Sequence, residues 1–578
     1  MSTVDLHPAR TVAESVFVAA QADPDRVALR YKADGQWRDE TVAELAGRVR
    51  ALTAGLIASG VRPGERVCIL GDTRPGWTYL SLALLAAGAV VVPIYPSSSV
   101  EDCAWVLRDS GATRVFCDAE HQRAKASAAE AATVLGFDAI PSLCAVGSSS
   151  VSSMDAVRAR LDALTPADLA VIIYTSGTTG PPKGCVLTHQ NWLTLVRIND
   201  ELNYVRRDDV VYLFLPLAHV FAQLEQFACL GAGATLVYFG GDIKQVVAEI
   251  AEVRPTFLPS VPRIFEKLYT VLTGALDEDT VRTATQVGWK YRSLQRAGNP
   301  IPDELAAAFD RFEPLYARVR AVFGGQVRQA LSGAAPIAPE VLTFFHAAGV
   351  PVLEGYGMTE TTGVGTVSTL DHFKIGSVGR AGPSIELRIA PDGEILARGP
   401  HLFAGYWHND AATAEIIDPD GWLHTGDLGT MDPDGFVTIT GRKKDIIITA
   451  GGKNIAPANF ENELRQSRWI SHAIMIGDRR PYPVALITLD ADETITWARA
   501  RDLPTDLPTL ATHPEVRTLI QDVLDKVNTR HANVEQIKRF AILPRDLSID
   551  HGELTPSLKV KRKAVHANHT DLIDSLYT

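Results

Sequence analysis

Residues 170–184 read AVIIYTSGTTGPPKG. The apolar start predicts a buried strand, which leads directly into a loop of glycines and hydroxyl side chains that ends in Lys183. Glycines let backbone N–H groups approach a phosphate, Ser and Thr add donors, and the lysine adds a positive charge. The loop is not the P-loop of kinases and ATPases, because Gly184 stands where that motif has Ser or Thr after its lysine. We therefore predict a phosphate-binding loop of another kind, with a flexible Ser/Thr/Gly loop as the alternative.

On both sides of this loop, short apolar segments alternate with helical patterns through the first 440 residues. Strands are expected at 66–70, 90–94, 114–117, 171–174 and 210–215, and helices at 41–59, 100–109 and 242–253. Such alternation predicts an α/β fold built from layers with mostly parallel sheets. The most apolar stretch, 79–95, is predicted to be a buried helix, a break at Gly88 and a buried strand rather than a membrane span.

Three later regions differ from this pattern. Residues 272–320 are rich in Ala, Arg, Glu and Asp and predict solvent-exposed helices. From 382 to 441, short strands at 385–389, 394–397 and 436–440 with Pro-Asp-Gly turns predict a small β-subdomain. Residues 442–578 are long enough for a separate α+β domain. We expect a large body, residues 1–441, followed by a smaller domain, residues 442–578.

The charge is unevenly distributed along the chain. The 56 Lys and Arg against 68 Asp and Glu give a net charge of −12, so the chain as a whole has no attraction for nucleic acid or anionic lipid. The segment from Arg442 onward carries +2 and the remainder −14. The six cysteines form no CxxC pair, which argues against a zinc site or a disulfide framework, and the N-terminus has no secretory pattern. We expect a cytoplasmic protein.

The loop resembles the phosphate-binding signature of the adenylate-forming enzymes, a superfamily of acyl-CoA synthetases, peptide-synthetase adenylation domains and firefly-type luciferases. Further segments resemble the family's other signatures, in the family's order and over nearly the whole chain. They are LPLAHVF at 215–221, SGAAP at 332–336, EGYGMTET at 354–361, GWLHTGD at 421–427, GRKKD at 441–445 and LTPSLKVKR at 554–562. The resemblance implies a body with a mobile C-terminal lid, and activation of a carboxylic acid by ATP and Mg²⁺ as an acyl-adenylate.

The resemblance also implies where ATP and AMP bind. The residues it assigns are Thr175, Ser176, Gly177, Thr178, Thr179, Gly180 and Lys183 in the loop, then Gly333, Ala334, Ala335, Glu354, Gly355, Tyr356, Gly357, Met358, Thr359, Asp427 and Arg442. An aromatic ring and small residues suit a flat base, and a carboxylate suits two ribose hydroxyls. Without the neighbouring motifs, Asp427 would be predicted only as a residue of a Gly-rich turn.

Three residues are assigned catalytic roles by the same resemblance. Glu360 is expected to hold the metal ion, with Thr175 sharing it; the alternative is a surface carboxylate. Lys559 is expected to stabilise charge on the α-phosphate and on the attacking carboxylate; the alternative is a solvated basic tail. The family often has Gly before this lysine, where this chain has Leu558. His219 is expected near the acyl carboxylate, and a packed loop histidine is its alternative.

The lid is expected to rotate between the two half-reactions. Lys444 resembles the family's hinge position, and after rotation Gly451, Gly452 and Lys453 would face the thiol of CoA. An exposed basic turn is the alternative interpretation of this segment.

PSVPRIFEK at 259–267, GGKNIAP at 451–457 and LTPSLKVKR resemble the long-chain branch of the acyl-CoA synthetases. The predicted function is an AMP-forming long-chain fatty-acid–CoA ligase whose partners are a fatty acid, ATP and CoA. A medium-chain, aryl or other lipid-like acid, a carrier-protein acceptor and a non-catalytic nucleotide-binding protein are the alternatives. Because the substrate partitions into lipid, peripheral membrane contact stays open, and the sequence gives neither the acyl chain length nor the oligomeric state.

Overall fold

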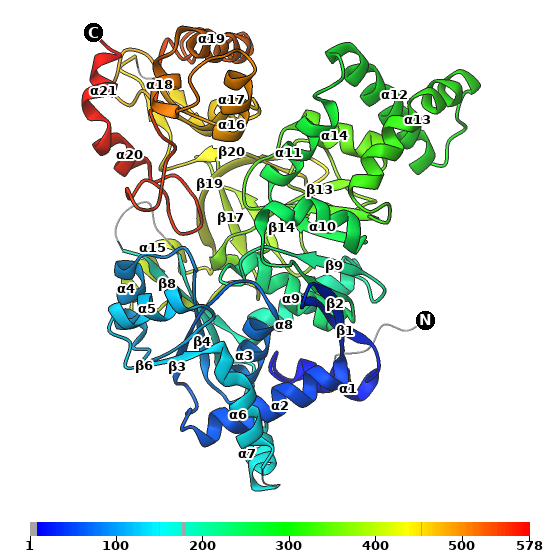
Figure 1. The fold of residues 1–578 in the computed structure, drawn as a ribbon, viewed down its shortest axis with the longest axis vertical. Coiled ribbons are helices and arrows are strands. Elements are labelled where there is room, and N and C mark those ends of the chain that lie inside the picture. The colour runs from blue at the N-terminus through cyan, green and yellow to red at the C-terminus, as the bar shows by residue number, and fades with distance from the viewer. Residues whose placement is uncertain (1–8, 150, 176–180, 452) are drawn as a thin grey trace.

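The computed structural model describes residues 9–149, 151–175, 181–451 and 453–578. The body contains two large sheets and a small one whose last strand ends at Arg442, and the C-terminal part that follows, the lid, is a separate lobe (Figure 1). This is the α/β architecture with a smaller C-terminal domain that the sequence predicts. Within the described ranges, no helix is both long and apolar enough to cross a membrane.

The first large sheet carries the predicted phosphate loop. Its order is β18-β8-β7-β4-β3-β5-β6, and the four strands β3 to β6 run parallel, as does β7 beside β4. β7 and β8 are antiparallel, and Thr175 pairs with Lys183 across them, so the two residues that flank the loop lie side by side. The bounds are β3 (Arg66–Leu70), β4 (Val90–Ile94), β5 (Arg114–Cys117), β6 (Thr133–Gly136), β7 (Leu169–Thr175), β8 (Lys183–Thr188) and β18 (Gly405–Tyr406).

The second large sheet has nine strands in the order β15-β14-β13-β12-β11-β9-β10-β1-β2. Six of them, from β13 to β1 in that order, form a parallel core with antiparallel strands at each edge. The bounds are β1 (Val27–Ala33), β2 (Gln36–Thr41), β9 (Val210–Leu213), β10 (Thr235–Tyr238), β11 (Phe257–Ser260), β12 (Gln329–Ser332), β13 (Val352–Tyr356), β14 (Thr366–Val367) and β15 (Arg380–Ala381).

The helices of the body bury apolar faces against these sheets. In α3 (Pro75–Ala86) every residue from Trp77 onward is buried, and Gly88 with φ +76° turns the chain into β4. The prediction of a buried helix, a break and a strand for 79–95 is therefore confirmed. The other helices are α1 (Ser15–Ala22), α2 (Val42–Ala58), α4 (Val100–Ser110), α5 (Glu120–Ala128), α6 (Ile140–Gly147), α7 (Val151–Ala163), α8 (His189–Leu202), α9 (Val220–Ala232), α10 (Val246–Val253), α11 (Pro262–Thr273), α14 (Pro339–Ala348) and α15 (Asp410–Ile416).

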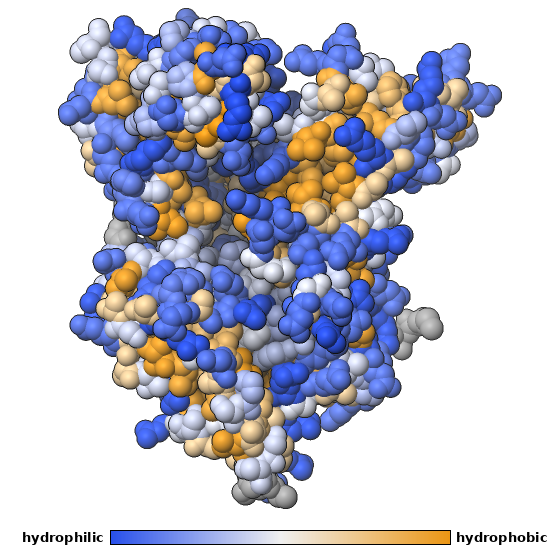
Figure 2. All heavy atoms as spheres, viewed as in Figure 1, coloured by the Kyte–Doolittle hydropathy of each residue, from blue (hydrophilic) through white to orange (hydrophobic). Residues whose placement is uncertain are grey.

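The predicted helical region near 272–320 forms α12 (Glu278–Arg296) and α13 (Asp303–Val322). These helices project beside α14 at the same end of the molecule as the lid, to the right of it in Figure 1. Figure 2 shows the lid and the insert as two lobes with a recess between them.

The small sheet corrects one local prediction. Its order is β16 (Glu386–Ile389), β17 (Glu394–Arg398), β19 (Leu423–Met431) and β20 (Val437–Arg442). Asp427 was expected in a Gly-rich turn, but it lies inside β19, opposite Arg442 of β20. The prediction was wrong because β19 pairs with a strand on each side, and this pairing outweighs the preference of the neighbouring glycines for a turn. The pairing with β20 shifts its register between Leu428 and Gly429, at one of these glycines.

The lid has its own sheet, β23 (Ile470–Ile476), β24 (Val484–Leu489) and β25 (Arg539–Ile542), and a short hairpin of β21 (Ile447–Ile448) and β22 (Asn454–Ile455). Its helices are α16 (Pro457–Arg465), α17 (Ala491–Arg499), α18 (Leu507–Thr512), α19 (Pro514–Asn528), α20 (Arg562–Asn568) and α21 (Thr570–Ser575). Among the described residues, the apolar clusters of the lid share no member with those of the body.

Candidate active site

Three of the predicted nucleotide residues meet at one carboxylate. Asp427 is 4% exposed, and its two oxygens accept hydrogen bonds from the hydroxyl of Tyr356 (2.7 Å) and from Nε of Arg442 (2.9 Å). Asp427 and Arg442 face each other across β19 and β20, whereas Tyr356 comes from the end of β13 in the second large sheet. Burial and the adjacent carboxylate raise the pKa of Tyr356 well above its usual value, which keeps it a hydrogen-bond donor.

A second cluster surrounds Glu360, which is 7% exposed. Its Oε1 accepts a 2.7 Å hydrogen bond from the hydroxyl of Tyr406, and Nζ of Lys183 lies 4.9 Å from the centre of the Tyr406 ring. The thiol of Cys185 lies 3.8 Å from the hydroxyl of Thr175, and burial together with the Glu360 charge raises the pKa of that thiol. Glu360, Thr175 and Lys183 are therefore gathered at the end of β7 and β8, around one aromatic ring and one thiol.

This cluster fits a magnesium ion that is held mainly by phosphate. The described residues contain no group of three or more His, Cys, Asp and Glu side chains that could enclose a metal. Mg²⁺ in nucleotide enzymes usually takes one or two carboxylates and completes its shell with phosphate oxygens and water. A single buried carboxylate next to a hydroxyl and a lysine is consistent with that arrangement.

Lys559 comes from the lid and interacts electrostatically with residues of both clusters. The residue is exposed. The protein that surrounds it and the guanidinium of Arg442 lower the pKa of Lys559, while the carboxylates of Glu360 and Asp427 act in the opposite direction. The structure therefore brings Arg442, Glu360 and Asp427 within electrostatic range of Lys559, although the four residues come from four separate segments of the chain.

His219 lies at the N-cap of α9, where its Nδ1 accepts a 3.1 Å hydrogen bond from the backbone N–H of Phe221. Burial, with the nearby Lys559 charge as a second cause, lowers the pKa of His219 to about 3. The imidazole is consequently neutral at physiological pH. It lines the pocket described next, and its edge faces the ring of Tyr95 at a centroid distance of 6.4 Å.

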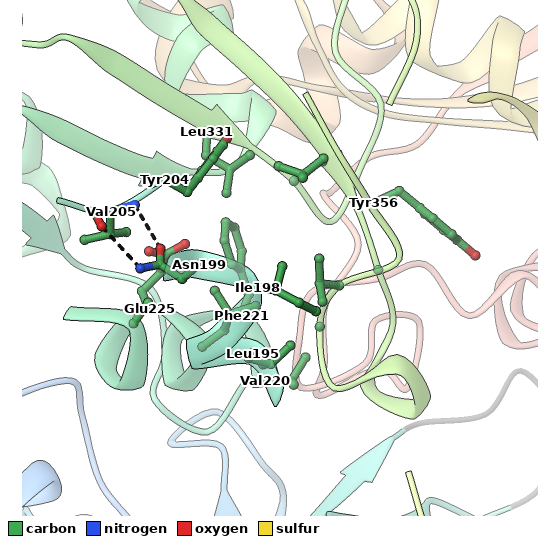
Figure 3. Close-up of a pocket in the computed structure, with 18 of the residues that line it drawn as sticks. Leu195, Ile198, Asn199, Tyr204, Val205, Val220, Phe221, Glu225, Leu331 and Tyr356 are labelled. Atoms are coloured by element: carbon green, nitrogen blue, oxygen red, sulfur yellow. Dashed lines mark hydrogen bonds between the residues drawn. The ribbon is translucent and has the colours of Figure 1, made fainter. Parts of the chain in front are cut away.

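An apolar pocket leads away from these residues into the body (Figure 3). The empty space within it, with adjoining open solvent included, is about 820 Å³. Six of the predicted site residues line it, namely His219, Gly333, Ala334, Gly355, Tyr356 and Gly357. The ring of Tyr356 points away from the other labelled side chains (Figure 3). The rest of the wall comes mostly from α8, α9, β12 and the segment 363–367. Val220 and Phe221, which begin α9, and Gly363 and Val364 belong to this wall.

The remaining predicted residues are placed as follows. Glu354 lies in β13, and burial raises its pKa to about 8. Met358 and Thr359 lie at the start of a short 3₁₀ turn that contains Glu360, and Ala335 is exposed outside the pocket lining. Gly451 and Lys453 are exposed in the lid, where Lys453 pairs with Glu535 at 3.3 Å. Ser176, Gly177, Thr178, Thr179, Gly180 and Gly452 lie outside the described residues.

Lys444 separates residues that are anchored to the body from residues that are anchored to the lid. The backbone N–H of Lys443 donates to the carbonyl of Gly426, and its Nζ lies 2.6 Å from Asp392 and 3.1 Å from Glu394. Asp445 lies 3.9 Å from Arg562, which is bound to Glu461 in the lid. Lys444 is exposed and lies between Lys443, which is bonded to the body, and Asp445, which lies near the lid residue Arg562.

Contacts between described residues hold the lid in this orientation. The hydroxyl of Ser97 donates to the carbonyl of Pro556 (2.6 Å), three residues before Lys559; Arg263 pairs with Asp490 (2.6 Å), and Lys526 lies 3.9 Å from Glu278. The first contact fixes the segment that carries the predicted catalytic lysine.

Sequence reasoning missed Tyr406 and the pocket side chains of α8. Tyr406 lies in the segment Phe403-Ala-Gly-Tyr-Trp407, whose aromatic residues beside a glycine could have indicated a packed turn but gave no sign that the ring reaches Glu360. The helical period of α8 predicts a buried face, yet it does not say whether protein or ligand covers that face.

Comparisons with known proteins give the same family over both parts of the chain. The model for "AMP-binding enzyme" matches residues 16–407, and that for "AMP-binding enzyme C-terminal domain" matches residues 444–578. A long-chain-fatty-acid–CoA ligase of Mycobacterium tuberculosis, FadD15, is 40% identical over 98% of this chain and 97% of its own length. Long-chain-fatty-acid–CoA ligase 1 of Homo sapiens is 30% identical over 93% of this chain and 82% of its own.

A solved structure of o-succinylbenzoate coenzyme A synthetase from Bacillus subtilis, in complex with ATP and a magnesium ion, has the same fold with a TM-score of 0.68. It is 22% identical, and the match covers 95% of this chain and 98% of that one. With the two family models covering both of its parts, the chain belongs to the AMP-binding enzymes, the adenylate-forming superfamily.

Proposed function

We propose that this protein is an AMP-forming ligase that activates a long-chain fatty acid as its acyl-adenylate and then transfers the acyl group to CoA. One observation carries the proposal: an apolar pocket is lined by Tyr356 and His219, Tyr356 is bonded to Asp427 and through it linked to Arg442, and the charge of Lys559 acts on His219 and is itself acted on by Arg442 and Asp427. Two long-chain-fatty-acid–CoA ligases, one of them 40% identical over nearly the whole chain, support this substrate and this acceptor.

In the first half-reaction, a carboxylate oxygen of the acid attacks the α-phosphorus of ATP and pyrophosphate leaves. Two anions must approach each other, so cations and oriented donors have to offset their repulsion. Lys559 would supply the cation between the carboxylate and the α-phosphate. Asp427 would accept the ribose hydroxyls, and Arg442, held by its bond to Asp427, would contact the ribose and phosphate. The neutral imidazole of His219 would border the acyl carboxylate without adding charge.

Glu360, with Thr175 beside it, would hold Mg²⁺, which offsets phosphate charge during the reaction. Tyr406 orients the Glu360 carboxylate through its 2.7 Å hydrogen bond, and its ring places the Lys183 ammonium beside the same site. Lys183 would contact the terminal phosphates of ATP.

In the second half-reaction, the thiolate of CoA attacks the acyl carbonyl and AMP leaves. We place the boundary between body and lid after Lys443, because Lys443 is bound to the body and Asp445 to the lid. Rotation about Lys444 would remove Lys559 and bring Gly451 and Lys453, both exposed in the described orientation, toward the thiol.

Replacement of Lys559 tests the assignment. Lys559→Ala should lower the rate of acyl-adenylate formation by at least about 100-fold, because a preorganised cation is lost from the transition state. The same variant should convert supplied acyl-AMP and CoA to acyl-CoA at nearly the wild-type rate. Fatty-acid-dependent pyrophosphate exchange measures the first step, and acyl-CoA release from synthetic acyl-AMP measures the second.

Lys563→Ala is the matched control, since Lys563 is an exposed lysine of the same basic segment. It should leave both steps unchanged. Normal adenylation by Lys559→Ala would remove the assigned role. A panel of carboxylic acids from two to twenty carbons, with CoA-dependent AMP release as the readout, tests the substrate class and separates CoA from other acceptors.

A further inference from the structure

Two helices, α8 and α9, each contribute one stripe of side chains to the wall of the pocket. On α8 the stripe has helical spacing (i, i+3, i+4, i+7), and α9 repeats the same spacing. The residues that line the pocket are Leu195, Ile198, Asn199 and Leu202 on α8, and Phe221, Leu224, Glu225 and Ala228 on α9. Each stripe is apolar except at its third member, where α8 has Asn199 and α9 has Glu225. Both polar side chains lie at the end of the pocket opposite Tyr356 (Figure 3).

Asn199 has a structural explanation. Its side-chain amide donates to the carbonyl of Val205 (3.2 Å) and accepts from the backbone N–H of Val205 (2.9 Å), as the dashed lines in Figure 3 show. It therefore holds the segment that carries Tyr204 against the pocket.

Glu225 and Tyr204 have no such explanation. Glu225 is 1% exposed, and its Oε2 has no hydrogen-bond partner in the described part of the chain. The hydroxyl of Tyr204, 8% exposed, likewise has no partner among the described residues. The two groups lie close enough for the Glu225 charge to raise the pKa of Tyr204. An unpaired buried polar group costs stability, and a leucine at position 225 would complete the stripe without that cost.

The charge states of these groups limit what they can bind. Burial raises the pKa of Glu225 to about 8, so the carboxyl is mostly protonated at neutral pH and both donates and accepts hydrogen bonds. The nearby guanidinium of Arg328 is paired with Asp209 and does not line the pocket. An anionic group would thus need a buried cation that does not line the pocket, and a cationic group would have to ionise Glu225, whereas a neutral hydroxyl can satisfy both groups as they stand.

We propose that the end of the pocket formed by Glu225 and Tyr204 binds a hydroxyl group on the distal part of the acyl chain. The site would select fatty acids hydroxylated at or near the terminal carbon over chains of the same length that end in a methyl group. This inference rests on the proposed function, because it takes the pocket to be the acyl site. A methyl end placed there would leave Glu225 and Tyr204 without partners, which is how such sites discriminate against the analogue that lacks the hydroxyl.

The test compares pairs of acids that differ only in a terminal hydroxyl, with chains of eight to eighteen carbons. The readout is kcat/KM for CoA-dependent AMP release, expressed as the ratio of the hydroxylated acid to its methyl-ended analogue. In the wild-type enzyme, at least one chain length should give a ratio of about 10 or more, the effect of one or two buried hydrogen bonds.

Three variants locate the effect. Glu225→Met, which keeps the side-chain volume and removes the hydrogen-bonding atoms, should bring the ratio to 1 or below and improve the methyl-ended acids. Glu225→Gln should keep a ratio above 1, because the amide still donates and accepts. Leu224→Met, one position away on the same stripe, should keep the wild-type ratio, which separates hydrogen bonding from altered packing.

The inference is overturned if hydroxylated and methyl-ended acids are used equally at every length, or if Glu225→Met leaves the ratio unchanged. Either outcome would leave the proposed ligase activity intact, since the methyl-ended acids would still be activated. Failure of every acid to release AMP in the presence of CoA would instead count against the proposed function.

Discussion

Asp427 uses its two oxygens for two different neighbours, Tyr356 and Arg442, which come from two different sheets. The carboxylate therefore holds the small β-sheet against the second large sheet at the mouth of the pocket. The same pairing favours the charged form of Arg442, because the Asp427 charge is the main cause that raises the pKa of Arg442. One residue thus connects the packing of the body with the expected ribose contacts.

Replacing this carboxylate by an amide should weaken nucleotide binding. We expect Asp427→Asn to raise the KM for ATP by roughly 10- to 100-fold, because hydrogen bonds to a charged group contribute about 1.5–3 kcal/mol. The measurement is the ATP dependence of pyrophosphate exchange at saturating fatty acid. Asp434→Asn, an exposed carboxylate of the same subdomain that pairs with Lys374, serves as the control and should keep the wild-type KM. An unchanged KM in Asp427→Asn would contradict the ribose assignment.

The chemistry of Asp427 could be predicted from the sequence, but its setting could not. The motif identified the residue type, yet the glycines beside it favoured a turn. Whether the segment becomes a strand depends on β17 and β20, and such non-local pairing cannot be derived from local propensity.

At the scale of elements, the segment between β20 and the lid is attached at both ends. Lys443 pairs with Asp392 and Glu394, Asp445 lies near Arg562, and the backbone N–H of Asp445 donates to the carbonyl of Arg442 across Lys444 (3.0 Å), so the proposed hinge at Lys444 would have to open this turn. A rotation of the lid there would use few backbone torsions.

A proline at this position should separate the two half-reactions. Proline fixes φ near −65°, so Lys444→Pro should leave acyl-adenylate formation near the wild-type rate and lower acyl transfer to CoA by about 10-fold or more. Lys444→Ala is the matched control, because it removes the charge while leaving the torsion free. Pyrophosphate exchange and acyl-CoA release are measured for each. A full rate of CoA transfer in Lys444→Pro would show that the hinge lies elsewhere.

The positions of many helices and strands could be predicted from the sequence, but the elements against which they pack could not. The expected strands at 66–70, 90–94 and 114–117 and the insert helices are confirmed, because apolar runs and helical spacing are local signals. The helix α9 was not predicted, although its apolar residues follow helical spacing. The pattern alone could not show that Glu225 faces a pocket rather than solvent, because that depends on where α8 and the segment around Tyr204 pack.

At the scale of the whole molecule, body and lid should respond differently to acid. Burial lowers the pKa of His189, His346 and His401 in the body to about 4, against a usual value of 6.5. Each stays neutral in the folded state while the unfolded chain takes up a proton. Their contribution to stability is complete above pH 6.5 and is lost as the pH falls toward 4. In the lid, burial raises the pKa values of Asp546 and Glu553, but hydrogen bonds lower them further, to about 2. The contribution of these two carboxylates to the stability of the lid therefore persists until the pH falls below about 4.

His401 offers a direct measurement, because it is 0% exposed and its two ring nitrogens have no hydrogen-bond partner within the described ranges. His401→Phe should reduce the loss of unfolding free energy between pH 7 and pH 5 by about 2 kcal/mol. Glu225 and Glu354 titrate in the opposite sense, so the comparison is made between variant and wild type by urea unfolding at each pH. Equal losses in the two proteins would mean that His401 is protonated in the folded state.

The single connection at Lys444 has a kinetic consequence. A lid joined by one peptide segment and held near the cleft by Ser97 and Arg263 keeps Lys559 at an effective concentration of the order of millimolar or higher around the pocket mouth. Delivery of the lysine is then an intramolecular event whose rate does not depend on how dilute the protein is. The few polar contacts between the two lobes in the described ranges can accordingly stay weak, because the covalent connection already supplies most of the proximity, and the proposed rotation would then have few bonds to break.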